Sequence, residues 1–348
     1  MSFTIRGVIE GFYDRLWTWP ERERVLRRTA EMGFNVYAYA PKEDRLQNAG
    51  WRTPYPDEQR RRLADFARLC RDLGVEPWMA LRPVGISYAD ESDVGLVIAK
   101  LRDYVELGAQ RLVLLADDIP SQLEPPVAGI FTGLANAHAW LIAELRQAIP
   151  SVPLTFCPTD YHGGGTDYLR SVAAAIPAEV ELFWTGPDVC SSQISGEAAG
   201  EIGAVLGRPP LVWDNYPVND AQMKDELHIG PIRDRDPDLH RYVAGILVNP
   251  AMEPEASLVP LATWADYLRD PESYDPDAAW QRALLDVCGN AADAQAVAAL
   301  AVARDRSVIR QPWRLPPRAA LDPIAQRAAS VSSDRLAEDL CRFVHSPA

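Results

Sequence analysis

RLVLLADD, residues 111–118, joins an unbroken run of five apolar residues to two adjacent aspartates. A near-continuous apolar run is typical of a strand that is buried on both faces, as in a parallel sheet. Similar short runs recur along the chain at 4–11, 35–42, 75–83, 153–160, 180–186, 210–215 and 244–250. Helix-compatible stretches separate them, and the clearest lie at 20–33, 57–74 and 133–149.

This alternation of strands and helices predicts the fold. Eight strand–helix units over about 250 residues are typical of a (β/α)8 TIM barrel, an α/β fold, which we assign to residues 1–261. An open doubly wound sheet is the alternative, but no glycine-rich phosphate loop follows the first strand. Beyond residue 260, the segments 274–289, 290–306 and 322–343 read as helices and 311–323 as a proline-rich link. We therefore predict a helical C-terminal region over 262–348.

The bulk composition excludes several classes of protein. The chain has 348 residues and a formal charge of −14 from 35 basic and 49 acidic residues, so we expect no nucleic-acid partner, because such binding rests on Lys and Arg. The first residues show no signal-peptide pattern, and no apolar run reaches the ~20 residues of a membrane span. We expect a cytoplasmic protein without membrane contact. The five cysteines form no CxxC pair, which indicates reduced thiols.

Polar residues follow most of the predicted strands. In TIM barrels the catalytic residues lie at the C-terminal ends of the strands, around one mouth. The third strand is an exception, because it ends in Arg82 and Pro83. The strand-end residues that we expect around the mouth are Glu10, Gly11, Lys42, Asp117, Asp118, Thr159, Asp160, Tyr161, Thr185, Asn215 and Asn249.

The adjacent aspartates, Asp117 and Asp118, restrict the chemistry. Neighbouring Cα atoms lie ~3.8 Å apart, whereas paired glycosidase carboxylates lie ~5–5.5 Å apart in retaining enzymes and ~6.5–9.5 Å in inverting ones. Two neighbours at a bent strand end suit substrate-assisted hydrolysis better. One ionised carboxylate would orient a 2-acetamido group, and the other, kept protonated by its like-charged neighbour, would transfer a proton. The pair could also simply cap the strand or the following turn.

A metal site is another use for carboxylates. It would draw on Asp160, His162, Asp214 and Asp220 as companions of the aspartate pair. No HxH or HExxH spacing supports this reading, so we expect neither a metal nor another cofactor.

Seven motifs in order along the chain carry a family resemblance. They are RGVIEGFYD (6–14), YAYAPKEDR (37–45), LLADDI (114–119), PTDY (158–161), FWTG (183–186), VWDNYPVND (212–220) and VNPAMEPEAS (248–257). Together they resemble glycoside hydrolase family 84, the β-N-acetylglucosaminidases that include protein O-GlcNAcases. The resemblance implies a (β/α)8 barrel and a retaining, exo-acting, substrate-assisted enzyme. Its substrate would be a β-GlcNAc glycoside or glycoprotein, and the oligomeric state is left open.

The resemblance also implies roles for ten residues. Asp117 would orient and polarise the 2-acetamido group, and Asp118 would act first as general acid and then as general base. Tyr161 would donate a hydrogen bond to the developing oxazoline. The other implied contacts are with sugar hydroxyls, for Gly11, Lys42, Asn215, Asp220 and Asn249, and with the acetamido group or the pocket floor, for Thr185 and Trp213.

Simpler roles stay open when these residues are taken one at a time. Lys42 could form a surface ion pair with Glu43 or Asp44. The other simple alternatives are a rim filler for Tyr161, a buried core residue for Trp213, a helix N-cap for Asp220 and an ordinary strand residue for Thr185.

Two residues depart from the pattern of the family. Asp14 stands where the family usually has glycine, and it could reshape the adjoining loop or add a carboxylate near the leaving group. Asp214 stands where many bacterial members have an aromatic residue, and it would make the pocket more acidic if it pointed inward. The alternative functions are a non-catalytic GlcNAc-binding protein and a metal-dependent hydrolase on the same barrel.

Overall fold

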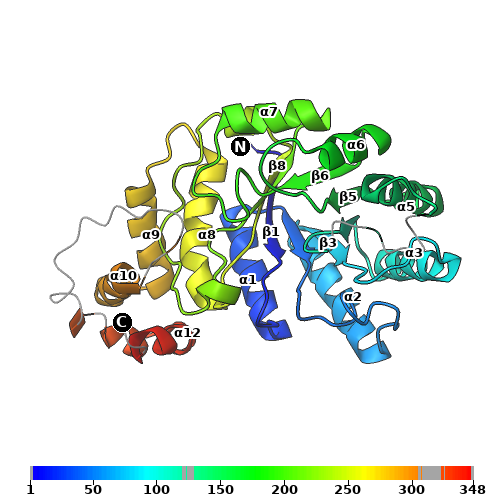
Figure 1. Ribbon diagram of the computed structural model, residues 1–348. Coiled ribbons are helices and arrows are strands. Elements are labelled where there is room, and N and C mark those ends of the chain that lie inside the picture. The colour runs from blue at the N-terminus through cyan, green and yellow to red at the C-terminus, as the bar shows by residue number, and fades with distance from the viewer. Residues whose placement is uncertain are drawn as a thin grey trace.

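The predicted strands close into one parallel barrel in a computed structural model, which describes residues 3–119, 123, 129–304, 307, 323–324 and 326–345. Each strand pairs with its sequence neighbour, and the last pairs with the first. The predicted (β/α)8 fold is therefore confirmed (Figure 1). The strands are β1 (Ile5–Glu10), β2 (Val36–Tyr39), β3 (Glu76–Leu81), β4 (Arg111–Leu115), β5 (Leu154–Cys157), β6 (Glu181–Trp184), β7 (Leu211–Asp214) and β8 (Gly245–Val248).

Strand β4 shows why its sequence is continuously apolar. Leu112 and Leu114 pack outward into the main core between the barrel and its helices. Val113 and Leu115 point the other way, into a separate core inside the barrel. Successive strand residues alternate in direction, so a strand that is covered on both faces needs apolar residues at every position.

Helices surround the barrel on its outer face (Figure 1). They are α1 (Trp19–Met32), α2 (Asp57–Asp72), α3 (Glu91–Glu106), α5 (Leu134–Ala148), α6 (Asp167–Ala175), α7 (Gly196–Leu206) and α8 (Pro254–Arg269). Local signals define their ends. In α1, Thr18 and Glu21 form a capping box, and Gly33 ends the helix at φ +96°, a conformation that glycine adopts without a steric penalty.

The connection between β7 and β8 is mostly irregular over residues 220–238. Within that range, all of which the structure describes, the helical segment is the three-residue 3₁₀ turn η1 (Ala221–Met223). A second short turn, η2 (Leu239–Arg241), follows just before β8.

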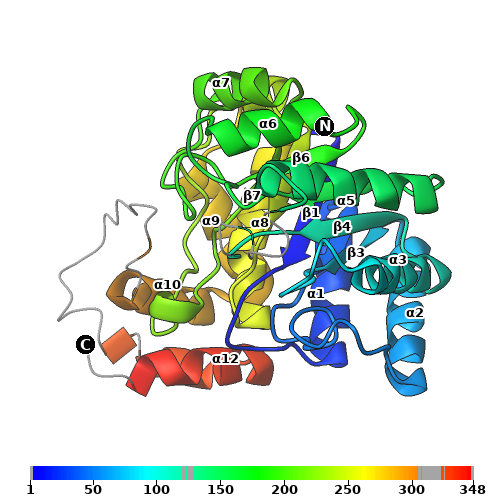
Figure 2. The ribbon, with the colours of Figure 1, turned by 45° about the vertical axis from the view of Figure 1, so that its right-hand side comes forward.

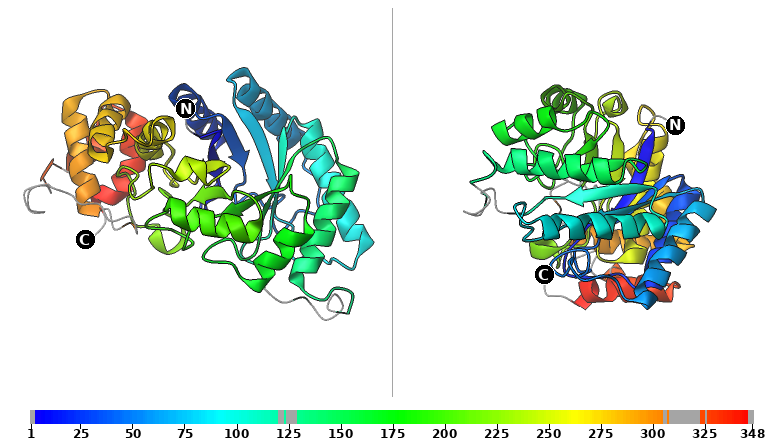
Figure 3. Two further views of the ribbon diagram at one scale, coloured as in Figure 1. Left: turned by 90° about the horizontal axis from the view of Figure 1, so that it is seen from above. Right: turned by 90° about the vertical axis from the view of Figure 1, so that its right-hand side faces the viewer.

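The C-terminal helices gather beside α8 on one side of the barrel (Figures 1 and 3). They are α9 (Pro276–Cys288), α10 (Ala291–Arg304) and α12 (Asp334–His345), with the 3₁₀ turn η3 (Gln326–Ser330). They share a second hydrophobic cluster with one face of α8. Helix α8 itself runs across residue 261, so the division at 261 and 262 stays a prediction. The proline-rich link, apart from Pro323, lies outside the described residues.

One predicted helix is wrong in its extent. The stretch 322–343 contains η3 and α12 as separate segments, with a break at residues 331–333. The Ser333 hydroxyl accepts a hydrogen bond from the Leu336 N–H, as an N-cap does. The Ser332 N–H is bound by the carboxylate of Asp293 on α10 at 2.8 Å. Helix α12 then packs against α8 and α10 (Figure 2).

Two further expectations concern the whole chain. All five cysteines are free thiols. In the part of the chain that the structure describes, no helix combines the length and the apolar character that crossing a bilayer requires.

Candidate active site

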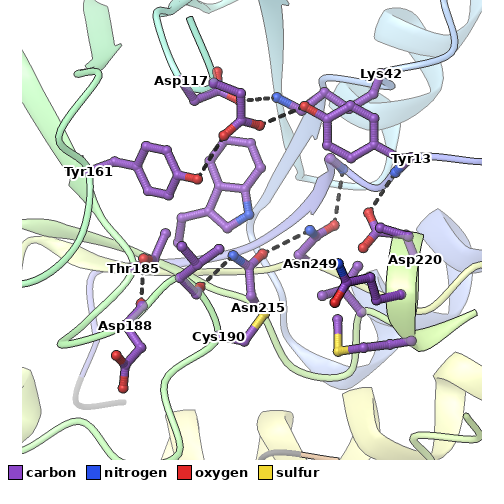
Figure 4. A pocket seen from close by; sticks show the side chains of 18 of the residues that line it. Tyr13, Lys42, Asp117, Tyr161, Thr185, Asp188, Cys190, Asn215, Asp220 and Asn249 are labelled. Carbon is purple, nitrogen blue, oxygen red and sulfur yellow. Dashed lines mark hydrogen bonds and ion pairs between the residues drawn. The ribbon is translucent and has the colours of Figure 1, made fainter. Parts of the chain in front are cut away.

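A cavity of about 890 Å³ opens at the carboxyl ends of the strands (Figure 4). It is lined by all ten residues to which the family resemblance assigned roles, and these come from segments between β1 and the end of β8. The further lining residues are Tyr13, Cys157, Asp188, Val189, Cys190, Ser192, Val218, Ala221, Gln222 and Met223.

Both aspartates reach this cavity because the chain turns between them. Asp117 continues the inward direction of Val113 and Leu115, and strand alternation would send Asp118 outward. Asp118 instead adopts φ +52°, in the left-handed region that aspartate tolerates better than most residues. Arg82 supports this turn, since its guanidinium donates to the carbonyl oxygens of Asp117 and Asp118, at 3.1 Å each. Arg82, which follows the third strand, therefore stabilises the turn that carries the two aspartates.

The Asp117 carboxylate is buried, with 5% of the residue exposed, and its two oxygens differ. Oδ2 forms an ion pair and hydrogen bond with the Lys42 ammonium (Figure 4). Oδ1 has no hydrogen-bond partner among the described residues, and Arg82 Nε lies 3.8 Å from it. A buried acceptor without a donor is costly, so this oxygen is suited to receive an N–H from a ligand. Lys42 does not form the surface ion pair that was its alternative.

Asp118 lies at the open side of the cavity and accepts two tyrosine hydroxyls. Tyr13 donates to Oδ2 at 2.6 Å and Tyr161 donates to Oδ1 at 2.9 Å. Partial burial raises the pKa of Asp118, but these two bonds and the charges of Lys42 and Arg82 outweigh it and lower the pKa below its ordinary value. The expectation that a like-charged neighbour keeps this carboxylate protonated is therefore wrong for the unliganded protein, because Lys42 neutralises Asp117.

Tyr13 is the main residue that the sequence analysis missed. It lies inside the first quoted motif, but nothing in its spacing points to Asp118, which is 105 positions away. Its backbone N–H also donates to the Asp220 carboxylate at 2.7 Å, and burial raises the pKa of that carboxyl. Asp220 therefore binds the loop after β1, and its side chain makes no cap to η1.

The opposite wall of the cavity is a row of amides. Asn249 accepts the Gly11 N–H at 3.1 Å through Oδ1 and donates through Nδ2 to Asn215 Oδ1 at 2.9 Å. Asn215 in turn donates to the Val189 carbonyl at 2.8 Å (Figure 4). This row orients both amides while each keeps further hydrogen-bonding capacity toward the cavity.

Trp213 lies under the cavity, with 5% of the residue exposed, and Gly11 packs against it. A Cβ atom on Gly11 would lie 2.2 Å from Trp213 Cζ2, so only glycine fits beside this ring. The indole N–H of Trp213 has no hydrogen-bond partner among the described residues. It is thus a second buried polar group that a ligand can satisfy.

We expect Gly11→Ala to lower the free energy of unfolding by about 1–3 kcal/mol, because the added methyl must displace the Trp213 ring. Urea denaturation measures this change. The matched control is Gly95→Ala on the exposed face of α3, where nothing lies within 4 Å of the new methyl, and which should be neutral or up to about 1 kcal/mol more stable. Equal stability of both variants would show that the ring moves aside freely.

Thr185 and its neighbours form the remaining wall. The Thr185 hydroxyl donates to the Asp188 carbonyl at 2.8 Å, which leaves its methyl group for the cavity wall. Cys157 lines the same cavity as a buried thiol. An apolar rim of Val189, Cys190 and Met223 completes the lining. Val189 and Cys190 come from the loop after β6 and Met223 from the short turn η1, whose positions local sequence patterns do not predict.

The two departures from the family pattern have defined places. Asp14, at φ +68°, accepts the Ala221 N–H at 2.7 Å and so joins the loops after β1 and β7. Asp214 does not point into the cavity; it is buried and bound through both carboxylate oxygens to Arg235, at 2.8 and 2.9 Å. The acidic pocket that an inward Asp214 would create is therefore not formed.

Other strand-end residues are also used elsewhere. Glu10 is buried and bound by Arg22 of α1, at 2.6 and 2.7 Å, so it faces away from the mouth. Thr159 and Asp160 do not line the cavity, and Asp160 accepts the Thr166 hydroxyl at 2.6 Å. The residues proposed for a metal site are thus not brought together, and among the described residues no group of three or more His, Cys, Asp or Glu side chains is placed to hold a metal ion.

Comparison with known proteins identifies the family of the chain. The family model described as beta-N-acetylglucosaminidase matches residues 6–302, which is most of the chain. The chain belongs to the β-N-acetylglucosaminidase family. This assignment confirms the resemblance to glycoside hydrolase family 84 that the seven motifs indicated.

Relatives of this β-N-acetylglucosaminidase family member include curated and structurally known proteins. The chain is 33% identical over 271 residues to the Protein O-GlcNAcase of Rattus norvegicus and to that of Mus musculus. The match covers 74% of the chain but only 29% of each relative. A mutant of the O-GlcNAc hydrolase of Thermobaculum terrenum superposes with a TM-score of 0.87 at 32% identity, over 98% of this chain and 75% of that one.

Proposed function

We propose that the chain removes terminal β-linked GlcNAc from a glycoside or from O-GlcNAc-modified protein, with retention of configuration and by substrate-assisted catalysis. The observation that carries the proposal is the Asp117 carboxylate, which lines the cavity and has one oxygen on Lys42 and the other without a hydrogen-bond partner among the described residues. An ionised, buried acceptor of this kind suits the N–H of a 2-acetamido group. The similarity to the rat Protein O-GlcNAcase and to the O-GlcNAc hydrolase of Thermobaculum terrenum supports the same substrate class.

The first step forms a bond within the sugar. The acetamido oxygen attacks the anomeric carbon while the bond to the leaving-group oxygen breaks, and Asp118 gives its proton to that oxygen. Asp117 holds the N–H and stabilises the positive charge that develops on the amide. In the second step water attacks the anomeric carbon of the oxazoline and loses its proton to Asp118, which restores the acetamido group.

Two features support the assignment of Asp118 as the proton donor. It lies on the open side of the cavity, where a leaving group departs. Tyr161 lies 2.9 Å from it, so a small rotation would carry this hydroxyl from Asp118 to an oxazoline oxygen. That transfer, together with exclusion of water by the bound sugar, would raise the pKa of Asp118 toward the range that a general acid needs.

The rest of the cavity would bind the sugar itself. Lys42, Asp220 and the joined amides Asn215 and Asn249 offer donors and acceptors to its hydroxyls, together with the Gly11 backbone. The Trp213 ring offers an apolar floor to the sugar ring or to the acetyl methyl. Thr185 would contact the acetamido group from the side.

We expect Tyr13→Phe to move the basic limb of the kcat/KM profile to higher pH. The Tyr13 hydroxyl lowers the pKa of Asp118, so its removal raises that pKa, and a general acid stays protonated, and active, up to a higher pH. The measurement is kcat/KM against pH, which reports ionisation in the free enzyme.

The matched control is Tyr55→Phe, which also removes a hydroxyl that is bound to a carboxylate at 2.6 Å, here that of Asp44, outside the cavity lining. It should leave the basic limb in place. A basic limb that stays fixed in Tyr13→Phe, or moves to lower pH, would contradict the role given to this hydroxyl.

The direct test of the proposed function is release of fluorophore from 4-methylumbelliferyl β-N-acetylglucosaminide, with and without EDTA. We expect turnover that EDTA does not change, with the β-anomer of GlcNAc as the first product by NMR. Absence of turnover by folded protein that still binds GlcNAc would favour a binding protein. Loss of turnover in EDTA would favour a metal-dependent hydrolase.

A further inference from the structure

A row of buried and half-buried polar groups lies behind the mouth, on the flank where α3, α5 and α6 stand side by side (Figure 1). At its centre is His138 of α5, with 1% of the residue exposed. Its Nε2 lies 2.8 Å from the Tyr88 hydroxyl, and its Nδ1 lies 2.7 Å from the Tyr168 hydroxyl. Burial lowers the pKa of His138 to about 3, so the imidazole is neutral and offers one donor and one acceptor.

One tautomer of His138 fits the hydrogen bond at the outer end of the row. The Tyr168 hydroxyl accepts the Thr159 N–H at 3.1 Å, and it can donate its own proton to His138 Nδ1 when that nitrogen is the acceptor. The remaining N–H, on Nε2, then donates to the Tyr88 hydroxyl. In this tautomer the Tyr168 hydroxyl bridges His138 and Thr159.

Thr159 connects the row to the catalytic groups. Its hydroxyl donates to the Ala116 carbonyl at 2.9 Å, and Ala116 directly precedes Asp117. Thr159 itself stands two residues before Tyr161. The contact between Thr159 and Ala116 therefore joins the end of β4 to the end of β5, where Tyr161 and Asp118 meet.

We propose that Tyr168, oriented by His138, is a positioning residue. It holds the backbone of Thr159, and with it the hydrogen bond from Thr159 to Ala116, and thereby places the Tyr161 hydroxyl against Asp118. Tyr168 does not line the cavity, so it acts only through Thr159. The competing explanation is that the row merely stabilises the packing of α5 and α6. The inference rests on the proposed function where its readout is hydrolysis.

The row contains its own control. The hydroxyls of Tyr88 and Tyr168 each form one hydrogen bond with His138, at nearly equal distances. Of the two, only Tyr168 also contacts Thr159. Tyr88→Phe and Tyr168→Phe thus remove the same chemical group from the same imidazole. A purely structural row predicts similar losses of melting temperature and similar small effects on activity for both variants.

We expect the two variants to differ in catalysis. Tyr168→Phe should lower kcat/KM by about tenfold to a hundredfold, the scale of a misplaced catalytic group, whereas Tyr88→Phe should change it by less than about twofold. Loosening the Tyr161 hydrogen bond also raises the pKa of Asp118, so the basic limb should move to higher pH in Tyr168→Phe alone. The groups that face Asp118, and that both variants retain, are Tyr13, Tyr161, Lys42, Arg82 and Asp117.

Crystal structures of the two variants complete the test. A Tyr161 hydroxyl that leaves Asp118 in Tyr168→Phe, and stays in Tyr88→Phe, would support the inference even if the wild type hydrolysed no GlcNAc substrate, a result that would overturn only the proposed function. Equal kinetics and an unmoved Tyr161 in both variants would overturn the inference while an active wild type upheld the proposed function.

Discussion

Asp117→Asn is expected to lower kcat/KM on 4-methylumbelliferyl β-N-acetylglucosaminide by about 10²–10³-fold. The asparagine keeps an oxygen that accepts the acetamido N–H, but it loses the negative charge that stabilises the charge developing on the amide. Preorganised groups of this kind contribute on that scale when a single one is removed. The substitution also leaves the buried Lys42 ammonium without its counter-ion, so circular dichroism and a thermal melt must accompany the kinetics.

The matched control for this variant is Asp188→Asn. Asp188 lines the same cavity but its carboxylate is exposed at the rim, so the charge change is the same and the buried ion pair is retained. We expect kcat/KM within about threefold of the wild type, since exposed charges are screened by solvent. Comparable losses in both variants would point to the overall charge of the cavity, and not to the unpaired oxygen of Asp117.

Asp118→Asn is expected to lower kcat/KM by about 10²–10⁴-fold on the same substrate, because its leaving group then departs without a proton. The basic limb of the pH profile should disappear with the titrating group. These two changes belong together, because both follow from the loss of a general acid.

Leaving-group dependence distinguishes this role from simple structural damage. A dinitrophenyl glycoside expels a stable anion and needs little protonation, so formation of the oxazoline should be far less impaired in Asp118→Asn. Pre-steady-state release of dinitrophenolate measures that step separately from the hydrolysis that follows. Equal losses on the two aglycones would contradict the assignment of Asp118 as the general acid.

The lowered pKa of Asp118 in the unliganded protein has a consequence for catalysis. A carboxylate held by two hydroxyls and two nearby cations is a poor proton donor until the substrate changes its surroundings. In the proposed mechanism, substrate binding supplies the shift in the pKa of Asp118, by removing water and by drawing Tyr161 toward the acetamido group. The hydroxyls of Tyr13 and Tyr161 would then link occupancy of the cavity to protonation of the acid.

One helix of the C-terminal region, α12, contacts the barrel near its mouth. Asp339 of α12 accepts the N–H groups of Glu255 and Ala256, at 2.7 and 3.1 Å, and so caps the start of α8 from outside. The start of α8 follows the end of β8, which places α12 at the same end of the barrel as the cavity. This contact places the C-terminal helices next to the site, although none of their described residues lines it.

Much of the fold and most of the cavity lining could be predicted from the sequence. The run LVLLA predicts a strand covered on both faces because alternation of side chains is a local property of any extended chain. Strand ends predict the mouth because the barrel places all eight of them at one end. The ten predicted site residues belong to motifs at those ends, which is why they line one cavity.

The break before α12 and the ion pair of Glu10 were beyond that reasoning. Ser332 and Ser333 end the predicted helix only because Asp293 and the packing on α8 favour a new start there. Glu10 points outward by the same alternation that turns Ile9 into the barrel, but only the fold brings Arg22 of α1 against it. In both cases the partner comes from another element.

The sequence by itself thus determined the barrel, its mouth and the residue types that surround it, because strand periodicity and motif order are properties of short segments. Only the tertiary structure decided which charges meet. Lys42 neutralises Asp117 across 75 positions, Tyr13 reaches Asp118 across 105, and Arg235 pairs with the outward-facing Asp214. Ion pairs and hydrogen bonds act over a few ångströms, and distances of that size between remote segments exist only once the barrel has closed.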